Sequence, residues 1–541
     1  MDFAFSTLMN LEWLDLSRNI IVSLSDGSFS GLARLKTLNL SFNSLTMKDL
    51  TFPQGVFIPL KSLKVLRLNK NNLGIKNGTG LNYPDRALSA LANLTYLSLD
   101  GIPNNTFGPG FQNMTSLRNL SLTDYLEGDC HMWSLYNTTF VNLSNLEYLH
   151  LADCFIKGLL IEPGAFSPLR KLYFLDLTHN EDIDVQHLAN VFYGLKDTTT
   201  LKILKMELVV NRYSLGICLE SRYINHFPQH LEEFHASENN LEAVDRQVIP
   251  MLSPSLKKLN VTGNKFVFGT YLQDLRLMAN LTEIDLSGGS FTYNLPSQYP
   301  FQIPKYDATN SCSLYQKTLE DAHKNPFVFN LPPNLKSIKM NKAGLRYTLS
   351  GLRVGKNSLE RLSLKGNYFP HLQGPLYGFD RLQYLDLSSS FIKRIEPDFF
   401  VTLTSLKYLT LSRNQLGNNL ADDASSAKVF SPLTNLQLLN LSFNALTNLP
   451  PNIFRNLTSL RVLSLEKNSL IDFIIDLSSL KKLQYLDLKE TRIASLGAET
   501  RRQIDALVQM NISVNMQRNP ILCDCSNQQF LEWMTSSEAF N

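Results

Sequence analysis

Six cysteines are the residues of this 541-residue chain with the most distinctive chemistry. Two of them, Cys523 and Cys525, stand in N-P-I-L-C-D-C, and the segment F-L-E-W follows at 530–533. A zinc site would need C-x-x-C pairs or clustered histidines, and the sequence contains neither. We therefore expect the cysteines to form disulfide bonds, and we expect no metal ion and no cofactor.

The rest of the composition does not indicate an enzyme. The sequence lacks the G-x-S-x-G, H-E-x-x-H, P-loop and dinucleotide-binding patterns that position catalytic groups. Histidines such as His131, His150, His179 and His323 are scattered, which is typical of structural residues. The net charge of +3 is too small to indicate a nucleic-acid or membrane-surface protein by bulk charge. These observations favour a binding protein.

Asparagines in the N-x-S/T pattern indicate the compartment. Thirteen occur, and together with the C-x-C pair they fit a secreted or luminal chain better than a cytosolic one. A repeat that generates N-L-S by chance is the alternative explanation for Asn39 and Asn440. The predicted glycosylation sites are Asn39, Asn77, Asn93, Asn104, Asn113, Asn119, Asn137, Asn142, Asn260, Asn280, Asn440, Asn456 and Asn511.

The stretch 436–460 shows which elements would position these residues. It reads LQLLNLSFNALTNLPPNIFRNLTSL, and its leucines precede Asn444 in the order L-x-x-L-x-L-x-x-N-x-L, the pattern of a leucine-rich repeat. In its strand, Leu439 and Leu441 point inward and the intervening side chains point outward. The turn after the strand would leave backbone groups unpaired at about 1–3 kcal/mol each, and we expect the Asn444 side chain to pair with them.

A single unit of this kind cannot be stable alone. Its buried aliphatic side chains contribute about 1.5–3 kcal/mol each, while ordering the backbone costs about 1–2 kcal/mol per residue. Neighbouring units must stack, which predicts an α/β leucine-rich-repeat solenoid, a horseshoe with a parallel sheet on its concave face. About nineteen strands are predicted, each followed by a marker asparagine or its substitute. The markers are Asn19, Asn43, Asn71, Ile102, Tyr125, Cys154, Asn180, Val209, Asn239, Asn264, Gly289, Ala343, Asn367, Ser390, Asn414, Asn444, Asn468, Thr491 and Asn519.

Three segments interrupt the rhythm of the predicted solenoid, which covers residues 1–518. The interval after Gly289 is about twice the usual length, and we favour an insertion loop at 290–334 over a degenerate repeat. Lengthened connections at 125–139 and 207–228 are the other two. Loops of this kind often carry the binding function of a repeat protein.

Both ends of the chain read as incomplete. Phe5, Leu8 and Leu11 have the spacing of a repeat's arm, so we infer that a capping unit and an export signal are missing before them. Residues 519–541 predict the start of a cysteine-rich C-terminal cap, truncated before the two cysteines that would bridge Cys523 and Cys525.

The remaining cysteines leave two alternatives open. Cys130 and Cys154 lie on consecutive turns, which makes a disulfide bond between them one alternative. The other is that Cys154 only replaces the marker asparagine, as this repeat permits. The sequence assigns no partner to Cys218 or Cys312.

The repeat F-x-x-L-x-x-L-x-x-L-x-L-x-x-N-x-L, the many N-x-S/T sites and the terminal NPILCDC…FLEW resemble the ectodomain of a Toll-like receptor over essentially the whole chain. This resemblance implies the ligand-binding part of a single-pass membrane receptor of innate immunity, at the cell surface or in an endosome. It also implies ligand-induced homo- or heterodimerisation, which brings cytoplasmic TIR domains together to recruit adaptors. The sequence shows no signal peptide, membrane span or TIR domain, so we expect only recognition and pairing from this polypeptide.

The family supplies no shared motif for the ligand, which could be a microbial lipopeptide, protein or nucleic acid. Five basic residues at outward strand positions after the insertion predict contact with phosphates or another anionic group. The alternative is a solvated surface whose charge is diluted by Glu283, Asp285 and Asp386. Tyr293, Tyr299, Tyr306 and Tyr315 in the insertion either line a contact or hold the loop on the solenoid. The basic residues are Lys336, Lys339, Lys342, Arg361 and Lys365, with Lys257 and Lys258 outward on an earlier strand.

A second hypothesis belongs to a different class. An extracellular leucine-rich-repeat adhesion or matrix protein would use the same strand face to bind a protein partner without an immune role. The sequence beyond residue 541 would separate the two hypotheses, since a membrane span followed by a TIR domain favours the receptor.

Overall fold

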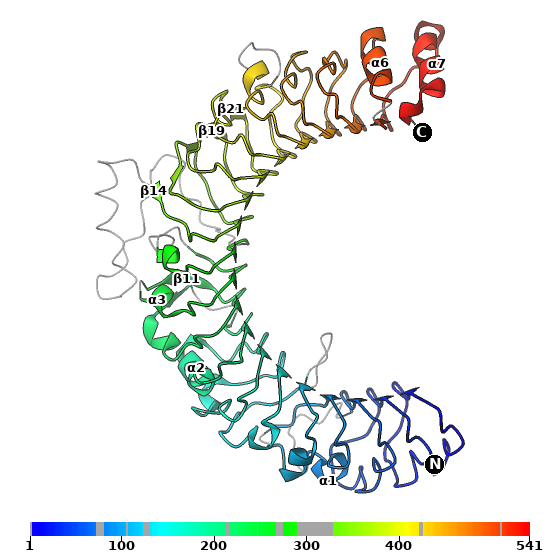
Figure 1. Cartoon of the computed structure of the whole chain (residues 1–541), viewed down its shortest axis with the longest axis vertical. Helices are drawn as coiled ribbons and strands as arrows, with labels where there is room; N and C mark the ends of the chain where they lie inside the picture. The colour runs from blue at the N-terminus through cyan, green and yellow to red at the C-terminus, as the bar shows by residue number, and fades with distance from the viewer. Residues whose placement is uncertain are drawn as a thin grey trace. The chain divides into compact units, whose positions relative to one another are not determined.

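The computed structural model describes residues 3–71, 81–103, 106–122, 130–211, 216–245, 247–266, 274–288, 328–420, 426–508 and 511–540. The described chain forms two compact units, one ending at Met278 and the other beginning at Ala279. The predicted insertion 290–334 falls largely outside the described residues, as do its four tyrosines. Each unit is a stack of turns with strands along one side and the connecting arms along the other (Figure 1).

The first unit has a sheet whose strands all pair in parallel with their neighbours in chain order. Each strand contributes three residues and buries or half-buries the middle one, as the leucine pattern predicts. The strands are β1 (Trp13–Asp15), β2 (Thr37–Asn39), β3 (Val65–Arg67), β4 (Tyr96–Ser98), β5 (Asn119–Ser121), β6 (Tyr148–His150), β7 (Phe174–Asp176), β8 (Ile203–Lys205), β10 (Glu233–His235) and β12 (Lys258–Asn260).

The second unit repeats this arrangement. Its strands are β13 (Glu283–Asp285), β15 (Ser337–Lys339), β18 (Arg361–Ser363), β20 (Tyr384–Asp386), β22 (Tyr408–Thr410), β23 (Leu438–Asn440), β24 (Val462–Ser464), β25 (Tyr485–Asp487) and β26 (Ser513–Asn515). Every predicted marker lies four residues after the end of one of these strands, in both units. The predicted parallel-sheet leucine-rich-repeat solenoid is therefore confirmed.

The arms between the strands contain short helices and small additional ladders. In α2, Leu188, Val191, Phe192 and Leu195 have helical spacing and are buried, so the helix forms by covering the core with one face. No helix in the described part of the chain is long and apolar enough to span a bilayer. The helices are α1 (Asp85–Leu88), α2 (Leu188–Leu195), α3 (Val248–Met251), α6 (Ala498–Asp505) and α7 (Gln528–Ser536). The ladders are β9 (Ile217–Leu219) with β11 (Leu241–Val244), β14 (Val328–Phe329) with β17 (Arg353–Val354), and β16 (Leu349–Ser350) with β19 (His371–Gln373) and β21 (Arg394–Ile395).

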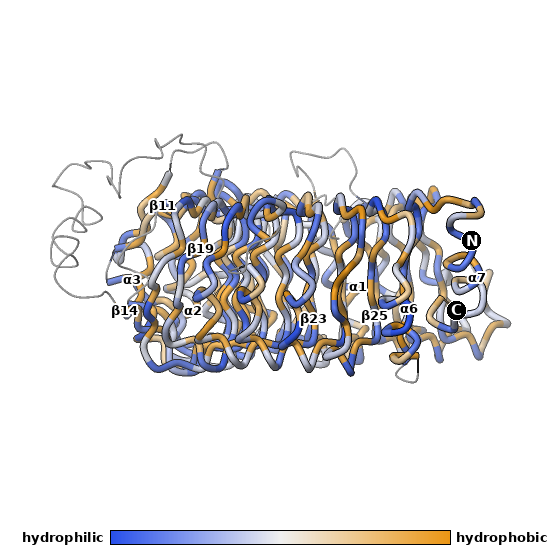
Figure 2. Tube along the Cα trace, turned by 90° about the horizontal axis from the view of Figure 1, so that it is seen from above, coloured by the Kyte–Doolittle hydropathy of each residue, from blue (hydrophilic) through white to orange (hydrophobic). Residues whose placement is uncertain are grey.

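Phenylalanines close the core on the arm side of each unit. Phe140 stacks between Phe107 and Phe166 at centroid distances of 5.9 and 5.8 Å. In the second unit the Phe400 and Phe430 rings lie 6.1 Å apart. The hydrophobic segments recur along the turns of each unit (Figure 2). Phenylalanines at equivalent positions of successive turns pack against one another. One turn therefore cannot bury its apolar face without the next turn.

The marker asparagines satisfy the backbone of the turns. Nδ2 of Asn444 donates to the carbonyl oxygens of Leu411, Leu441 and Ser442 at 2.9, 3.0 and 3.2 Å. The Leu411 carbonyl belongs to the preceding turn, so each asparagine also links one turn to its neighbour. The predicted role of Asn444 is confirmed, and its side chain is fully buried.

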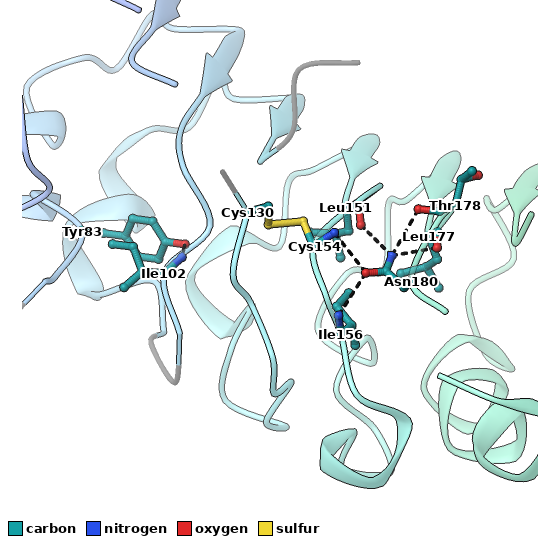
Figure 3. Close-up of a disulfide and its surroundings, with 9 residues drawn as sticks. All are labelled: Tyr83, Ile102, Cys130, Leu151, Cys154, Ile156, Leu177, Thr178 and Asn180. Carbon is teal, nitrogen blue, oxygen red and sulfur yellow. Dashed lines mark hydrogen bonds between the residues drawn. A yellow bond between two sulfur atoms is a disulfide. The ribbon is translucent and has the colours of Figure 1, made fainter. Parts of the chain in front are cut away.

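Two of the turns of the first unit that lack the asparagine use other groups (Figure 3). The Tyr83 hydroxyl accepts a hydrogen bond from the Ile102 N–H at 3.2 Å, and burial raises the pKa of Tyr83. Cys154 forms a disulfide bond with Cys130. The structure thus has the disulfide alternative, and Cys154 does more than replace the marker asparagine. Cys154 is in turn held by Asn180, whose Oδ1 accepts from the Cys154 N–H at 3.1 Å.

The other cysteines differ in their bonding. Cys523 and Cys525 are free and exposed. Cys218 takes part in a disulfide bond, and Cys312 lies outside the described residues. In the segment predicted to begin a cap, Phe530 of α7 is buried and Trp533 Nε1 donates to Asp505 Oδ1 at 2.8 Å. These contacts join the segment to the last turns of the second unit, and its identity as a cap stays a prediction.

Candidate ligand-binding surface

The five predicted ligand residues lie on two neighbouring turns of the second unit. In the register of β15 and β18, Arg361 pairs with Ser337 and Lys339 pairs with Ser363. The Arg361 N–H donates to the Lys336 carbonyl at 2.9 Å, and the Lys342 N–H donates to the Lys365 carbonyl at 2.7 Å. All five side chains are exposed. We call this surface the basic face: Lys336, Lys339, Lys342, Arg361 and Lys365.

Most of the positive charge of the basic face is unpaired. Lys339 Nζ lies 3.7 Å from Asp285 Oδ2. Within the described part of the chain, the other four cations form no salt bridge. Like charges on adjacent turns repel one another, and among the described residues only Asp285, beside Lys339, forms a salt bridge with this surface. The arrangement is suited to an external anion.

Lys257 and Lys258, just before and at the start of β12, show the opposite arrangement. Lys257 Nζ lies 2.6 Å from Glu232 Oε2, and Lys258 Nζ lies 2.9 Å from Glu233 Oε1. The hydrogen bond from Lys257 lowers the pKa of the Glu232 carboxyl group. The strand face of the first unit therefore neutralises these cations internally, which distinguishes Lys257 and Lys258 from the basic face.

The nearby acids that dilute the charge are turned toward their own turns. Asp285 Oδ1 accepts from the Ser287 N–H at 3.0 Å, and Asp386 Oδ1 accepts from the Ser388 N–H at 2.8 Å. Each carboxylate thus satisfies the backbone two residues ahead of it. In Asp285 the second oxygen, Oδ2, lies 3.7 Å from Lys339 Nζ on the next turn.

A glycine permits the close approach of two turns in the basic face. Gly366 has a φ of +75°, and a Cβ placed there would lie 2.8 Å from Cγ of Lys342. The aliphatic part of Lys342 therefore lies against Gly366. A side chain at residue 366 would both strain the backbone and displace Lys342.

Two tyrosines extend the basic face along the sheet, and sequence reasoning did not single them out. Arg361, Tyr384 and Tyr408 occupy the same register position on β18, β20 and β22. Tyr408 is 41% exposed. Burial, with a smaller contribution from the Asp386 carboxylate, raises the pKa of the Tyr384 hydroxyl. Aligning the repeats on their leucines would have found both, because both stand between the first two leucines of their strands.

The predicted glycosylation sites divide into strand and arm positions. Asn39 and Asn440 lie on strands, and their Oδ1 atoms accept from the N–H groups of Ser41 and Ser442 at 3.1 and 2.9 Å. Asn119 and Asn260 also lie on strands. Asn77 and Asn104 fall outside the described residues. The exposed sites off the strands are Asn93, Asn113, Asn137, Asn280, Asn456 and Asn511, while Asn142 is half-buried.

Comparison with known proteins finds similarity to leucine-rich-repeat proteins. Residues 2–45, 128–181, 357–416 and 416–470 match the family model described as leucine rich repeat. Toll-like receptor 4 of Pinctada imbricata is 29% identical over 94% of this chain and 60% of its own length. The transforming growth factor beta activator LRRC33 of Danio rerio is 26% identical over 89% of this chain and 66% of its own length.

The fold is also found in a solved receptor structure. Toll in the Drosophila Toll–Spatzle complex superposes with a TM-score of 0.56 at 16% identity, covering 95% of this chain and 62% of that chain. At this identity the similarity shows a shared fold. The chain spans about three fifths of the length of the receptor relatives that it matches.

Proposed function

We propose that this chain, a leucine-rich-repeat ectodomain of the Toll-like-receptor type, binds an anionic microbial ligand through the basic face of its second unit. Ligand-induced pairing with a second receptor chain, and signalling through TIR adaptors, belong in this proposal to the whole receptor. The chain matches 60% of the length of its Pinctada relative, which leaves room for those parts. Innate immune recognition is thus the function that we assign to the full protein.

The unpaired cations carry this proposal. Four of the five cations have no carboxylate partner among the described residues, whereas the matched Lys257 and Lys258 are paired. Lysines present point charges that suit phosphate or sulfate groups, and Arg361 can donate two parallel hydrogen bonds to one such group. Tyr384 supplies aromatic surface next to Arg361, and Tyr408 extends it by one strand. An anionic ligand with an apolar or aromatic part would contact both the cations and the tyrosines.

Charge reversal should separate a specific site from general attraction. We expect the double substitution Lys342→Glu and Lys365→Glu to raise the Kd for long-chain inorganic polyphosphate about 100-fold at 0.15 M salt, because two phosphate contacts become repulsive. The matched control is Lys257→Glu with Lys258→Glu, which changes the net charge equally and should alter Kd less than about threefold. Fluorescence anisotropy with labelled polyphosphate measures both. Equal losses in the two variants would contradict a site at the basic face.

Glycan attachment tests which of the predicted glycosylation sites are accessible in the folded chain. We expect a chain expressed through the secretory pathway to carry a glycan at Asn456 and none at Asn440. Asn456 is exposed on an arm, whereas the Asn440 side chain lies on the sheet and accepts from Ser442. Glycopeptide mass spectrometry reads both sites in one digest. Occupancy of Asn440 equal to that of Asn456 would show that the sheet does not protect its asparagines.

An extracellular adhesion or matrix protein remains the second candidate. The similarity to the transforming growth factor beta activator LRRC33 leaves this candidate open, because that relative matches most of the chain at nearly the same identity as the Toll-like receptor. A span followed by a TIR domain in the complete coding sequence would support the receptor. Further adhesion modules, or an immediate stop, would support the second candidate.

A further inference from the structure

In the first unit, the loop that follows β5 and the loop that follows β6 are linked covalently. The disulfide bond Cys130–Cys154 joins them. Backbone pairing continues beyond it: the Lys157 N–H donates to the Trp133 carbonyl at 3.0 Å, and the Leu135 N–H donates to the Leu160 carbonyl at 3.1 Å. The two loops thus form one rigid platform, which lies outside both the strand face and the basic face.

This platform displays apolar side chains to solvent. Phe155 is 54% exposed and Leu159 is 80% exposed. The Phe155 ring stacks on His131 at a centroid distance of 5.4 Å, and Lys157 Nζ lies 5.5 Å from the Trp133 ring centroid. We call this surface the staple patch: His131, Trp133, Phe155, Lys157, Leu159 and Leu160.

Folding does not account for the exposed phenylalanine. Phe155 follows the marker Cys154 and has a φ of +53°. The equivalent positions after Asn239, Ser390 and Asn444 are Asn240, Phe391 and Ala445, also left-handed, and Phe391 is 51% exposed. A bulky side chain is disfavoured in this conformation, and Asn is tolerated best after glycine. Phe155 differs from Phe391 in that a disulfide bond links its loop to a second loop and its ring stacks on His131 of that loop.

We propose that the staple patch is a docking surface for a polypeptide that presents apolar side chains beside a carboxylate. Trp133 and Phe155 supply the aromatic centre typical of interface hot spots. Among the described residues Lys157 forms no salt bridge, and its ammonium group lies over Trp133. A partner that covers this cation must bring an anion to it, because a buried unpaired charge is costly. The stapled loops lose little freedom on binding.

Other occupants fit the patch less well. Recruitment to an anionic membrane uses clusters of about four to eight basic residues, and the staple patch contains one lysine. A stable dimer of this chain would bury about 800 Å² per partner, which six side chains do not provide alone. The patch is small enough for a peptide segment and has the charge to orient it.

The test selects a partner from a defined pool. A displayed library of random twelve-residue peptides is panned on the full chain, and the enriched peptides are synthesised. We expect them to combine Leu, Phe or Trp with Asp or Glu. Phe155→Ser with Leu159→Ser should weaken their binding at least about tenfold. Lys157→Glu should also weaken peptide binding, and the loss should be larger at low salt than at high salt. Leu50→Ser is the matched control, since Leu50 is 92% exposed in the same unit.

Three other results would contradict the proposal. Enriched peptides that are basic, or that bind the Phe155→Ser and Leu159→Ser variant as well as the wild type, would place recognition elsewhere. Patch-dependent binding to vesicles containing phosphatidylserine, without peptide enrichment, would assign the patch to membranes. Patch-dependent self-association in light scattering would assign it to a second copy of the chain. Circular dichroism melts confirm that the surface substitutions leave the fold intact.

Discussion

Replacing Asn180 by alanine is expected to destabilise the first unit by about 4 kcal/mol or more, because several buried backbone groups lose their partner together. Asn180 Nδ2 donates to the Leu151 and Leu177 carbonyl oxygens at 2.9 and 2.7 Å. Its Oδ1 accepts from the Cys154 and Ile156 N–H groups at 3.1 and 3.0 Å. These groups belong to two turns, so the loss weakens a turn and its contact with the next (Figure 3).

Urea unfolding of the chain measures this loss, and hydrogen exchange locates it. The midpoint should fall, and the amides of Cys154 and Ile156 should exchange much faster than in the wild type. Asn145→Ala is the matched control: Asn145 Oδ1 accepts from Lys171 Nζ at 2.8 Å in an exposed bond, and its removal should cost less than about 1 kcal/mol. An Asn180→Ala variant as stable as the Asn145→Ala variant would show that the marker asparagines do not stabilise the turns.

Removing the disulfide bond is expected to cost about 3–4 kcal/mol at 25 °C by loop-closure entropy, with Cys130→Ala and Cys154→Ala together. The bridged residues are 24 positions apart, and in the unfolded chain the bridge restricts that whole loop. In the folded chain it also holds the platform of the staple patch. We therefore expect urea unfolding at lower concentration, together with weaker binding of any peptide that recognises the patch.

A third variant separates the bridge from the marker position. Cys130→Ala with Cys154→Asn restores an asparagine where the repeat expects one, and about 1–2 kcal/mol should return through its hydrogen bonds. Peptide binding at the staple patch should stay weak, since an asparagine does not tie the two loops. If Cys130→Ala with Cys154→Ala melts like the wild type, the bridge contributes nothing to folding and the patch needs another support.

Most of the fold could be read from the repeat pattern. The strand after Leu436 and the buried role of Asn444 follow from residues within one turn, because leucine alternation and a following asparagine are local signals. The same pattern located the strands in turns where Ile102, Cys154 or Thr491 replaces the asparagine. The five residues of the basic face could be chosen in the same way, as outward strand positions of two turns.

The groups that pair with outward strand residues depend on how neighbouring turns stack. Lys258 and Lys339 are both outward on their strands, yet Lys258 lies 2.9 Å from Glu233 on the adjacent strand, whereas Lys339 lies 3.7 Å from Asp285. The same stacking brought the Tyr83 hydroxyl to the Ile102 N–H and exposed Phe155 beside His131. The physical reason is that turns differ in length, so a side chain's neighbour on the next turn is fixed by parallel register and not by distance along the chain.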